Sequence, residues 1–184
     1  RPFRGRVKHR WDNDASNSGR RHHNRITRYM LYLLGHPGNE NEFIQVMINA
    51  GSPQLRVDTE PAGNEFLDRN FESGSDGELY RIDDEWWFRD SWDRSNRDAS
   101  WNYKNTDNAG NYRTEWMKRT LEAEDDFTSI INLFQTASGS YNQTQIEQLA
   151  DPDAIMKMFV VRGYIDDWDS ISLRRGKNGY MYRR

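Results

Sequence analysis

The sequence contains no cysteine, and this absence removes several chemistries at once. Disulfide bonds, zinc–thiolate sites and thiol nucleophiles are excluded. Long hydrophobic runs are missing too: no segment approaches the roughly 20 apolar residues that cross a bilayer, and no signal peptide is visible. The chain starts at Arg1 without an initiator methionine and stops at Arg184. We therefore expect a processed or truncated piece of a longer protein, with no membrane span of its own.

Histidine is scarce, and its four copies all lie in the first 36 residues. Adjacent side chains on a helix diverge by about 100°, so His22 and His23 are expected to be solvated and not to share a metal ion with His9 or His36. No Ser/His/Asp triad can be assembled from histidines confined in this way. The sequence also lacks the Gly-x-Gly-x-x-Gly and Walker patterns. Aspartate and glutamate are too numerous for a glycosidase pair to be selected.

Hydrophobic residues make up only 35% of the 184 residues, charged residues make up 30%, and the mean hydropathy is -1.08. Disorder does not follow, because 7 Trp, 9 Tyr and 8 Phe supply apolar area that disordered chains lack. We predict an aromatic-rich core beneath a very polar surface.

Positive charge is concentrated at the start of the chain, although the net charge is -3. The first 28 residues hold nine Arg or Lys against Asp12 and Asp14. Such a segment could bind nucleic acid, but the remainder is acidic and no aromatic residues alternate with the basic ones, which argues against that partner. The favoured functional interpretation is that Arg25 and Arg28 hold phosphate groups of a small ligand. Solvated surface is the alternative.

Hydrophobic periodicity and turn residues predict the elements of the first half. Residues 1–19 form a basic arm or the remnant of a preceding element, and residues 20–184 form one domain. From residue 20 to Gly35 we predict a helix with an apolar face and an opposite face carrying Arg21, Arg25 and Arg28. The apolar face consists of Ile26, Tyr29, Met30, Leu33 and Leu34. A hairpin of residues 43–49 and 55–58 follows, then a helix opened by Pro61, and strands at 78–83 and 86–89.

The second half is predicted to be mainly helical. An irregular loop of residues 90–111, dense in Asp, Asn, Ser and Trp, precedes helices at 112–123, 126–137 (capped by Asp125 or Asp126) and 143–149. Asp151–Asp153 opens a last helix, 154–165, whose inward residues are Ile155, Met158, Phe159 and Val161. An alternating Gly-Tyr-Met-Tyr segment then indicates a strand. The fold class is α+β, a small antiparallel sheet beside a helical half.

The terminal stretch Asp166–Arg184 holds the clearest chemical pattern. Three carboxylates surround Trp168, and Asn178 stands nine positions after Asp169 at the head of the last strand. A carboxylate and an amide in this arrangement could together hold a cation and a phosphate. The alternative is a helix end with solvated charges followed by an ordinary strand.

The order of these pieces resembles the spore coat protein H (CotH) kinase family, atypical protein kinases found in spore coats and in many secreted bacterial proteins. The stretches that carry the resemblance are Phe43–Asp58 with Glu60, Glu65–Phe71, Gly77–Arg81, Tyr112–Trp116, Asp126–Ile131, Phe159–Ser170 and Lys177–Tyr182. The resemblance implies a partial protein-kinase-like fold. It also implies phosphate transfer from ATP to Ser or Thr of an extracellular or coat protein, with secretion or display at the cell surface. The lack of cysteine agrees with that location.

The resemblance also implies roles for individual residues. Asp169 would take the proton of the acceptor hydroxyl and lie near the metal, and Asn178 would bind magnesium through its amide oxygen, by analogy with kinase catalytic loops. Glu60 would pair with a nucleotide-binding lysine.

Two departures from the family pattern leave the enzymatic activity uncertain. A further Trp-Asp-x-Asp segment, whose aspartate binds metal in the family, does not occur before Arg184. The early Arg-Gly-Asn-Ser strand and its lysine are missing, with Phe3–Arg6 as a remnant. We expect either a fragment of an active kinase, truncated at its C-terminal end, or a catalytically inactive scaffold that binds surface or matrix proteins.

Overall fold

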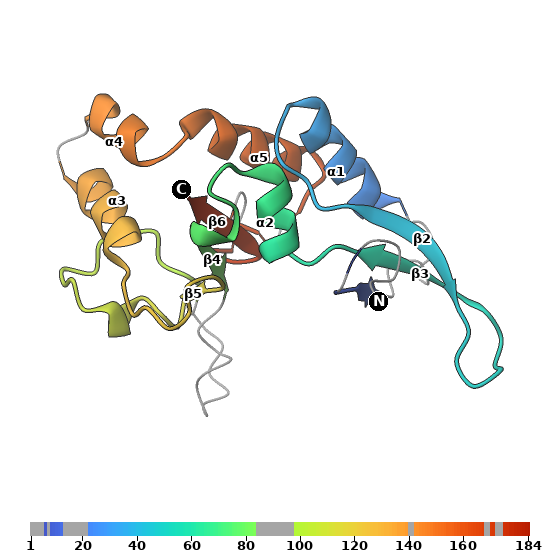
Figure 1. Ribbon diagram of the computed structural model, residues 1–184. Coiled ribbons are helices and arrows are strands. Elements are labelled where there is room, and N and C mark those ends of the chain that lie inside the picture. Colours follow the sequence, from blue (N-terminus) through green and yellow to red (C-terminus); the bar gives the residue numbers. More distant parts are fainter. Residues whose placement is uncertain are drawn as a thin grey trace. The chain divides into compact units, whose positions relative to one another are not determined.

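The computed structural model describes residues 6, 8–12, 22–83, 98–139, 142–167, 170–171 and 175–184, with the backbone alone at Asp12 and His23. Within these residues, five helices and two three-stranded antiparallel sheets confirm the α+β class (Figure 1). The elements are β1 (Arg10–Asp12), α1 (His23–Leu33), β2 (Asn41–Val46), β3 (Gln54–Thr59), α2 (Asn64–Asn70), β4 (Glu78–Ile82), β5 (Trp116–Lys118), α3 (Thr128–Ser138), α4 (Gln143–Leu149), α5 (Pro152–Tyr164) and β6 (Gly179–Arg183). The chain divides into two compact units, Arg1–Gly74 and Ser75–Arg184.

The first unit is built on the predicted hairpin. Strands β2 and β3 pair over their whole lengths, from Asn41 opposite Thr59 to Val46 opposite Gln54. The short strand β1 pairs with the other edge of β3, which gives the order β1-β3-β2. Strand β3 is therefore central in its sheet, and its last residues are buried. Two of these buried residues are Asp58 and Thr59, so the interior of this unit is unusually polar.

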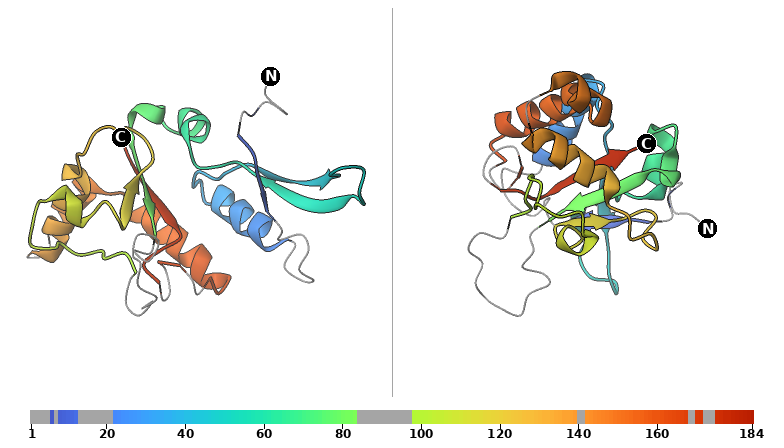
Figure 2. Two further views of the ribbon diagram at one scale, coloured as in Figure 1. Left: turned by 90° about the horizontal axis from the view of Figure 1, so that it is seen from below. Right: turned by 90° about the vertical axis from the view of Figure 1, so that its left-hand side faces the viewer.

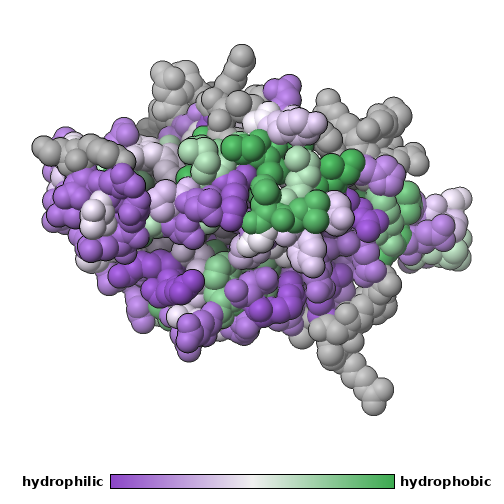
Figure 3. Space-filling view, turned by 90° about the horizontal axis from the view of Figure 1, so that it is seen from above, coloured by the Kyte–Doolittle hydropathy of each residue, from purple (hydrophilic) through white to green (hydrophobic). Residues whose placement is uncertain are grey.

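Helix α1 lies alongside the hairpin (Figure 2). The side of the helix that faces the hairpin is not the apolar face predicted from the periodicity. The guanidinium of Arg25 lies 5.0 Å from the Phe43 ring centroid, and Arg28 donates to Thr59. The predicted apolar face is instead largely exposed, with Tyr29 61% and Leu33 63% exposed. Figure 3 shows hydrophobic residues (green) grouped among hydrophilic ones (purple) on the face seen from above. An arginine can pack its stem and π-facing guanidinium on a ring, which periodicity alone does not anticipate.

Helix α2 begins three residues later than predicted, at Asn64 after an N-cap at Gly63, and Pro61 lies outside it. Its buried side chains are Phe66 and Leu67, at the centre of the helix. Arg69, in the last turn, extends its guanidinium toward the end of β3, where it meets Glu60.

The second unit holds the predicted aromatic core. Its sheet has the order β5-β4-β6, and α3 contributes Ile130, Ile131 and Phe134 to the core cluster. The ring centroids of Trp116 and Phe134 lie 5.0 Å apart. Trp101 packs on Trp116 at 4.8 Å. Large rings fill this core because the chain offers few aliphatic residues for the purpose.

One predicted helix of the second unit is wrong, and the others are confirmed. Residues 112–123 form turns and the strand β5, because Trp116 is fully buried in the core and pairs with Ile82 of β4. Helices α3, α4 and α5 occur where they were expected, and Asp151 caps α5 by accepting from the Ala154 N–H. The N-cap of α3 is Phe127 rather than Asp125 or Asp126, although Asp126 accepts from the Thr128 N–H.

Fewer side chains of α5 are fully buried than predicted. Of the four side chains expected to point inward, Val161 is buried, while Ile155, Met158 and Phe159 are half-buried. Helix α5 runs from Pro152 to Tyr164, so it begins two residues earlier and ends one residue earlier than predicted. The predicted strand 86–89 and residues 90–97 of the predicted loop lie outside the described residues.

Strand β6 approaches β4 so closely that one position has no room for a side chain. A Cβ added at Gly77 would lie 2.2 Å from the Tyr182 hydroxyl and 2.6 Å from the Arg183 carbonyl oxygen. We expect Gly77→Ala to lower the free energy of unfolding by about 1–3 kcal/mol, because the strands must separate to admit the methyl group. Chemical denaturation would measure the change. Gly163→Ala is the control, since it meets nothing within 4 Å and should be neutral or slightly stabilising.

Glu78, at the start of β4, binds cations and hydroxyls from its own strand and from neighbouring elements. Its Oε1 accepts from the Tyr80 hydroxyl at 3.0 Å and lies 3.0 Å from Lys118 Nζ, and Arg183 donates to Oε2 at 3.3 Å. Burial alone would raise the pKa of Glu78, but hydrogen bonds from Ser129, Lys118 and Tyr80 outweigh it and lower the pKa below its ordinary value of 4.5.

A carboxyl group whose pKa is lower in the folded state stabilises the fold at pH values above its unfolded-state pKa. This contribution is lost as the pH falls through the folded-state pKa. We expect Glu78→Gln to lower the melting temperature at pH 7 and to approach the wild type near pH 3. Melting curves across this range would test it. The exposed Glu122→Gln should follow the wild type throughout; a Glu78→Gln deficit that persists unchanged into acid would contradict the assignment.

Candidate functional site

The predicted site residues are distributed over both units. Glu60, Arg25 and Arg28 belong to the first unit and Asn178 to the second. Asp169, the predicted catalytic base, lies outside the described residues. The contacts that bear on these residues are centred on Glu60 in the first unit and on Arg162 in the second.

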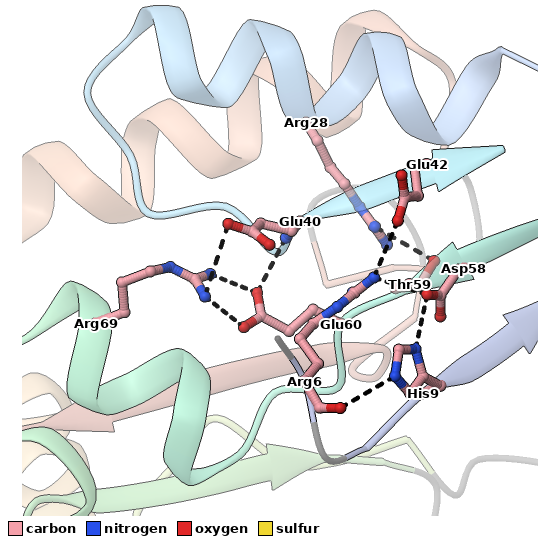
Figure 4. A network of polar contacts seen from close by, with 9 residues as sticks. All are labelled: Arg6, His9, Arg28, Glu40, Glu42, Asp58, Thr59, Glu60 and Arg69. Carbon is pink, nitrogen blue, oxygen red and sulfur yellow. Dashed lines mark hydrogen bonds and ion pairs between the residues drawn. The ribbon is translucent and has the colours of Figure 1, made fainter. Parts of the chain in front are cut away.

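Glu60 is the centre of the first cluster (Figure 4). Its carboxylate is only 1% exposed and binds Arg69 in a two-pronged ion pair, with Nη1 2.7 Å from Oε1 and Nη2 2.5 Å from Oε2. The Glu40 N–H donates to Oε2 at 3.0 Å. Among the described residues, the cation on Glu60 is thus an arginine, and the predicted pairing with a lysine stays a prediction.

The Arg69 guanidinium remains charged for a physical reason. The hydrogen bond to Glu60 raises the pKa of the Arg69 guanidinium, against the lowering effect of burial. Planar guanidinium and carboxylate groups match in geometry, so their two parallel hydrogen bonds are among the stronger polar contacts in proteins. The backbone of Glu60 is also bound to the segment before β2. Its N–H donates to the Glu40 carbonyl, and its carbonyl accepts from the Asn39 side chain.

A second buried carboxylate, Asp58, was not singled out from the sequence. Its Oδ2 accepts from Arg6 Nη2 at 2.7 Å and lies 2.7 Å from His9 Nδ1, and the side chain is fully buried. Arg6 also lies 3.6 Å from Glu42. Asp58 and Glu60 are two positions apart on and just after one strand, and this spacing was the available signal. Arg6 and His9 are brought to Asp58 by β1, whose pairing no short-range pattern indicates.

Arg25 and Arg28, the predicted phosphate-binding residues, both make contacts within their own unit. Arg28 Nη1 donates to Thr59 Oγ1 at 3.4 Å, and Arg25 lies over Phe43. His22, Arg25, Ile26 and Tyr29 line a shallow, open hollow on the surface of α1. Phosphate binding by these arginines stays a prediction.

The second cluster is organised by Arg162, in the last turn of α5. Its Nε donates to Asp167 Oδ2 at 2.8 Å, and its Nη1 donates to the Asn178 carbonyl at 2.6 Å. Helix α5 ends in a Schellman arrangement, in which the Asp166 N–H donates to the Gly163 carbonyl and the Asp167 N–H to the Arg162 carbonyl. The residue at the left-handed position of this arrangement is Asp166, with φ 54°.

Asn178 stands where the sequence predicted it, immediately before β6. Its backbone is also left-handed, with φ 59°, and the residue is exposed. The amide oxygen is a hard donor of the kind that Mg²⁺ accepts, and Mg²⁺ commonly keeps several waters and takes one or two protein ligands. The chemistry of Asn178 therefore fits a magnesium ligand. In the described ranges, no three His, Asp or Glu residues gather into a metal site.

Removal of the charge on Glu60 should destabilise the first unit. We expect Glu60→Gln to lower the free energy of unfolding by roughly 2 kcal/mol, because an amide placed against Arg69 leaves a buried site without its anion. Glu40→Gln is the matched control: Glu40 contacts the same arginine at 3.9 Å but is 61% exposed, so its loss should be small. Equal effects of the two variants in chemical denaturation would contradict a special role for Glu60.

No helix in the described part of the chain is long and apolar enough to cross a membrane. No curated protein and no solved structure compared with the chain matches it. A family model described as CotH kinase protein does match, over residues 7–184. This match covers nearly the whole chain, including Glu60 and Arg162, so the protein belongs to the CotH kinase family.

Proposed function

We propose that this chain is part of an atypical kinase that transfers phosphate from ATP to Ser or Thr of a protein acceptor. The observation that carries the proposal is the family match, which spans Glu60, Asp169 and Asn178 together. Further support comes from the local structure around Asn178, because an exposed oxygen donor held in a left-handed conformation at a strand start suits a ligand.

The proposed roles follow from what phosphate transfer requires. The protein supplies positioning and charge neutralisation rather than covalent chemistry. Asp169 accepts the proton of the acceptor hydroxyl, and Asn178, with Asp169, holds magnesium. When bound, magnesium–ATP supplies the phosphate, and the metal neutralises charge on its oxygens. Glu60 orients a cation toward the nucleotide, and Arg25 and Arg28 contribute positive charge for its phosphates.

The acceptor that we propose is an extracellular, cell-surface or coat protein of a bacterium, encountered after secretion. The high density of charged residues on a chain without cysteine is compatible with that environment.

A second candidate function is a catalytically inactive scaffold that binds surface or matrix proteins. The specific observation in its favour is the occupation of Glu60, whose two carboxylate oxygens are bound by Arg69. A glutamate engaged in this way serves to hold its own unit together, and a kinase-like scaffold needs no more from it.

Incubation of the protein with radiolabelled ATP and magnesium, with casein as a generic Ser/Thr acceptor, distinguishes the two functions. We expect labelled acceptor or self-labelled protein from the wild type and a loss of at least about 100-fold in Asp169→Asn, because general-base catalysis contributes about 10²–10⁴-fold. Asp125→Asn is the control, since Asp125 forms an exposed ion pair with Arg113. Transfer that survives in Asp169→Asn would overturn the base assignment.

Calorimetric titration with ATP and magnesium complements this assay. Magnesium-dependent binding supports the kinase. An absence of both binding and transfer in a folded wild-type protein would overturn the kinase and leave the scaffold.

A further inference from the structure

Arg162 joins the two ends of the segment that connects α5 to β6. All three of its side-chain nitrogen groups are used: Nε and Nη2 lie 2.8 Å and 2.6 Å from Asp167 Oδ2, and Nη1 lies 2.6 Å from the Asn178 carbonyl oxygen. Its backbone carbonyl also accepts from the Asp167 N–H at 3.0 Å. Arg162 therefore restrains the chain at Asp167, five residues later, and at Asn178, sixteen residues later.

These contacts hold the backbone at two sparsely populated conformations. Asp166 and Asn178 both have positive φ angles, 54° and 59°. Asp and Asn tolerate this left-handed conformation better than other non-glycine residues, but at some cost relative to right-handed backbone. Charge-assisted hydrogen bonds from Arg162, whose side chain is 19% exposed, can offset that cost. Without the Arg162 side chain, the Asp167 carboxylate and the Asn178 carbonyl lose this restraint, while the backbone hydrogen bonds that end α5 remain.

The identity of the side chain matters as much as its charge. A guanidinium presents separate N–H groups in one rigid plane, so it can bind a carboxylate on one side and a carbonyl on the other. A lysine ammonium is a single point charge on a flexible stem and cannot span both partners in the same way. In the sequence, Arg162 lies in a largely apolar run, Ile155 to Ile165, and this placement is explained by the two contacts.

We propose that Arg162 is a positioning residue for phosphate transfer, which acts by fixing the backbone of Asn178 and the carboxylate of Asp167. The inference rests on the proposed function, in which Asn178 binds magnesium. Arg162 touches neither nucleotide nor metal in this proposal. It holds the backbone from which the Asn178 side chain extends and so limits where the side-chain oxygen can lie, a role like that of outer hydrogen-bond partners of metal ligands in general.

Two variants test the proposal with two kinds of measurement. Arg162→Lys keeps the charge and removes the planar fork, and Arg162→Ala removes both. Arg113→Ala is the control, because Arg113 forms an exposed ion pair in the same unit. Amide hydrogen exchange over residues 165–180 reports the restraint without any need for activity. Magnesium titration of phosphate transfer, or of ATP binding by calorimetry, reports the consequence for the metal.

We expect faster amide exchange in both Arg162 variants and a magnesium requirement about 10-fold higher, the lower end of what loss of an outer-shell partner costs. The melting temperature should change little in Arg162→Lys, and KM for the protein acceptor should not change. Arg113→Ala should match the wild type in both measurements.

The outcomes separate this inference from the proposed function. Unchanged exchange in both variants overturns the restraint itself. Faster exchange with unchanged magnesium dependence makes Arg162 a purely structural residue and overturns its positioning role. A wild type that neither binds magnesium–ATP nor transfers phosphate overturns the proposed function, and the positioning role with it. Active wild type with unaffected variants overturns the inference alone.

Discussion

The pairing of β6 with β4 is the constraint on which the second unit depends. It brings residues 179–183 back onto residues 78–82, about 100 positions earlier in the chain. Everything between them, including the aromatic core and α3 to α5, is therefore closed into one loop by a single strand pair. The absence of a side chain at Gly77 permits this closeness, since Tyr182 occupies the space that a Cβ would fill. The position of Asn178 follows directly, because it precedes the paired strand.

The two units achieve stability by different means. The second has an aromatic core in which Trp116 packs against Phe134 and its indole N–H donates to the Ser100 carbonyl. The first buries Asp58 and Glu60 beside a few apolar residues such as Leu67. Buried charges are tolerable only when they are paired and hydrogen-bonded. Arg69 and Arg6 are thus requirements of the fold of this unit, whatever ligand it binds.

A comparable principle connects structure and proposed activity in the second unit. Kinase chemistry depends on accurately placed oxygen donors rather than on reactive nucleophiles. Placement has some cost here, because Asp166 and Asn178 adopt left-handed backbone conformations, although Asp and Asn tolerate them better than most residues. Arg162 offsets that cost from outside the proposed ligand set. The same arrangement accounts for a charged residue inside the last, mainly apolar helix.

Local signals predicted most elements correctly. The hairpin, α3, α4, α5 and β6 follow from periodicity, capping residues and β-rich runs, all of which act over a few residues. The predicted helix at 112–123 failed because burial of Trp116 and its pairing with Ile82 outweighed a weak local preference. The predicted orientation of α1 was wrong for a related reason. Arg25 and Arg28 contact Phe43 and Thr59, and the periodicity of a helix does not indicate such contacts with another element.

The candidate site divides in the same way. Glu60 and Asn178 were identified from the order of motifs along the chain, and the family assignment needed no coordinates. Their surroundings were not predictable from sequence, because each partner comes from a separate element: Arg69 from α2, and Arg162 from α5. The sequence by itself determined which side chains could supply oxygen ligands or charge to the site, because residue type and spacing along the chain can be read without knowing the fold. Only the tertiary structure decided which of them meet, since contacts between distant residues depend on strand pairing and on how helices end.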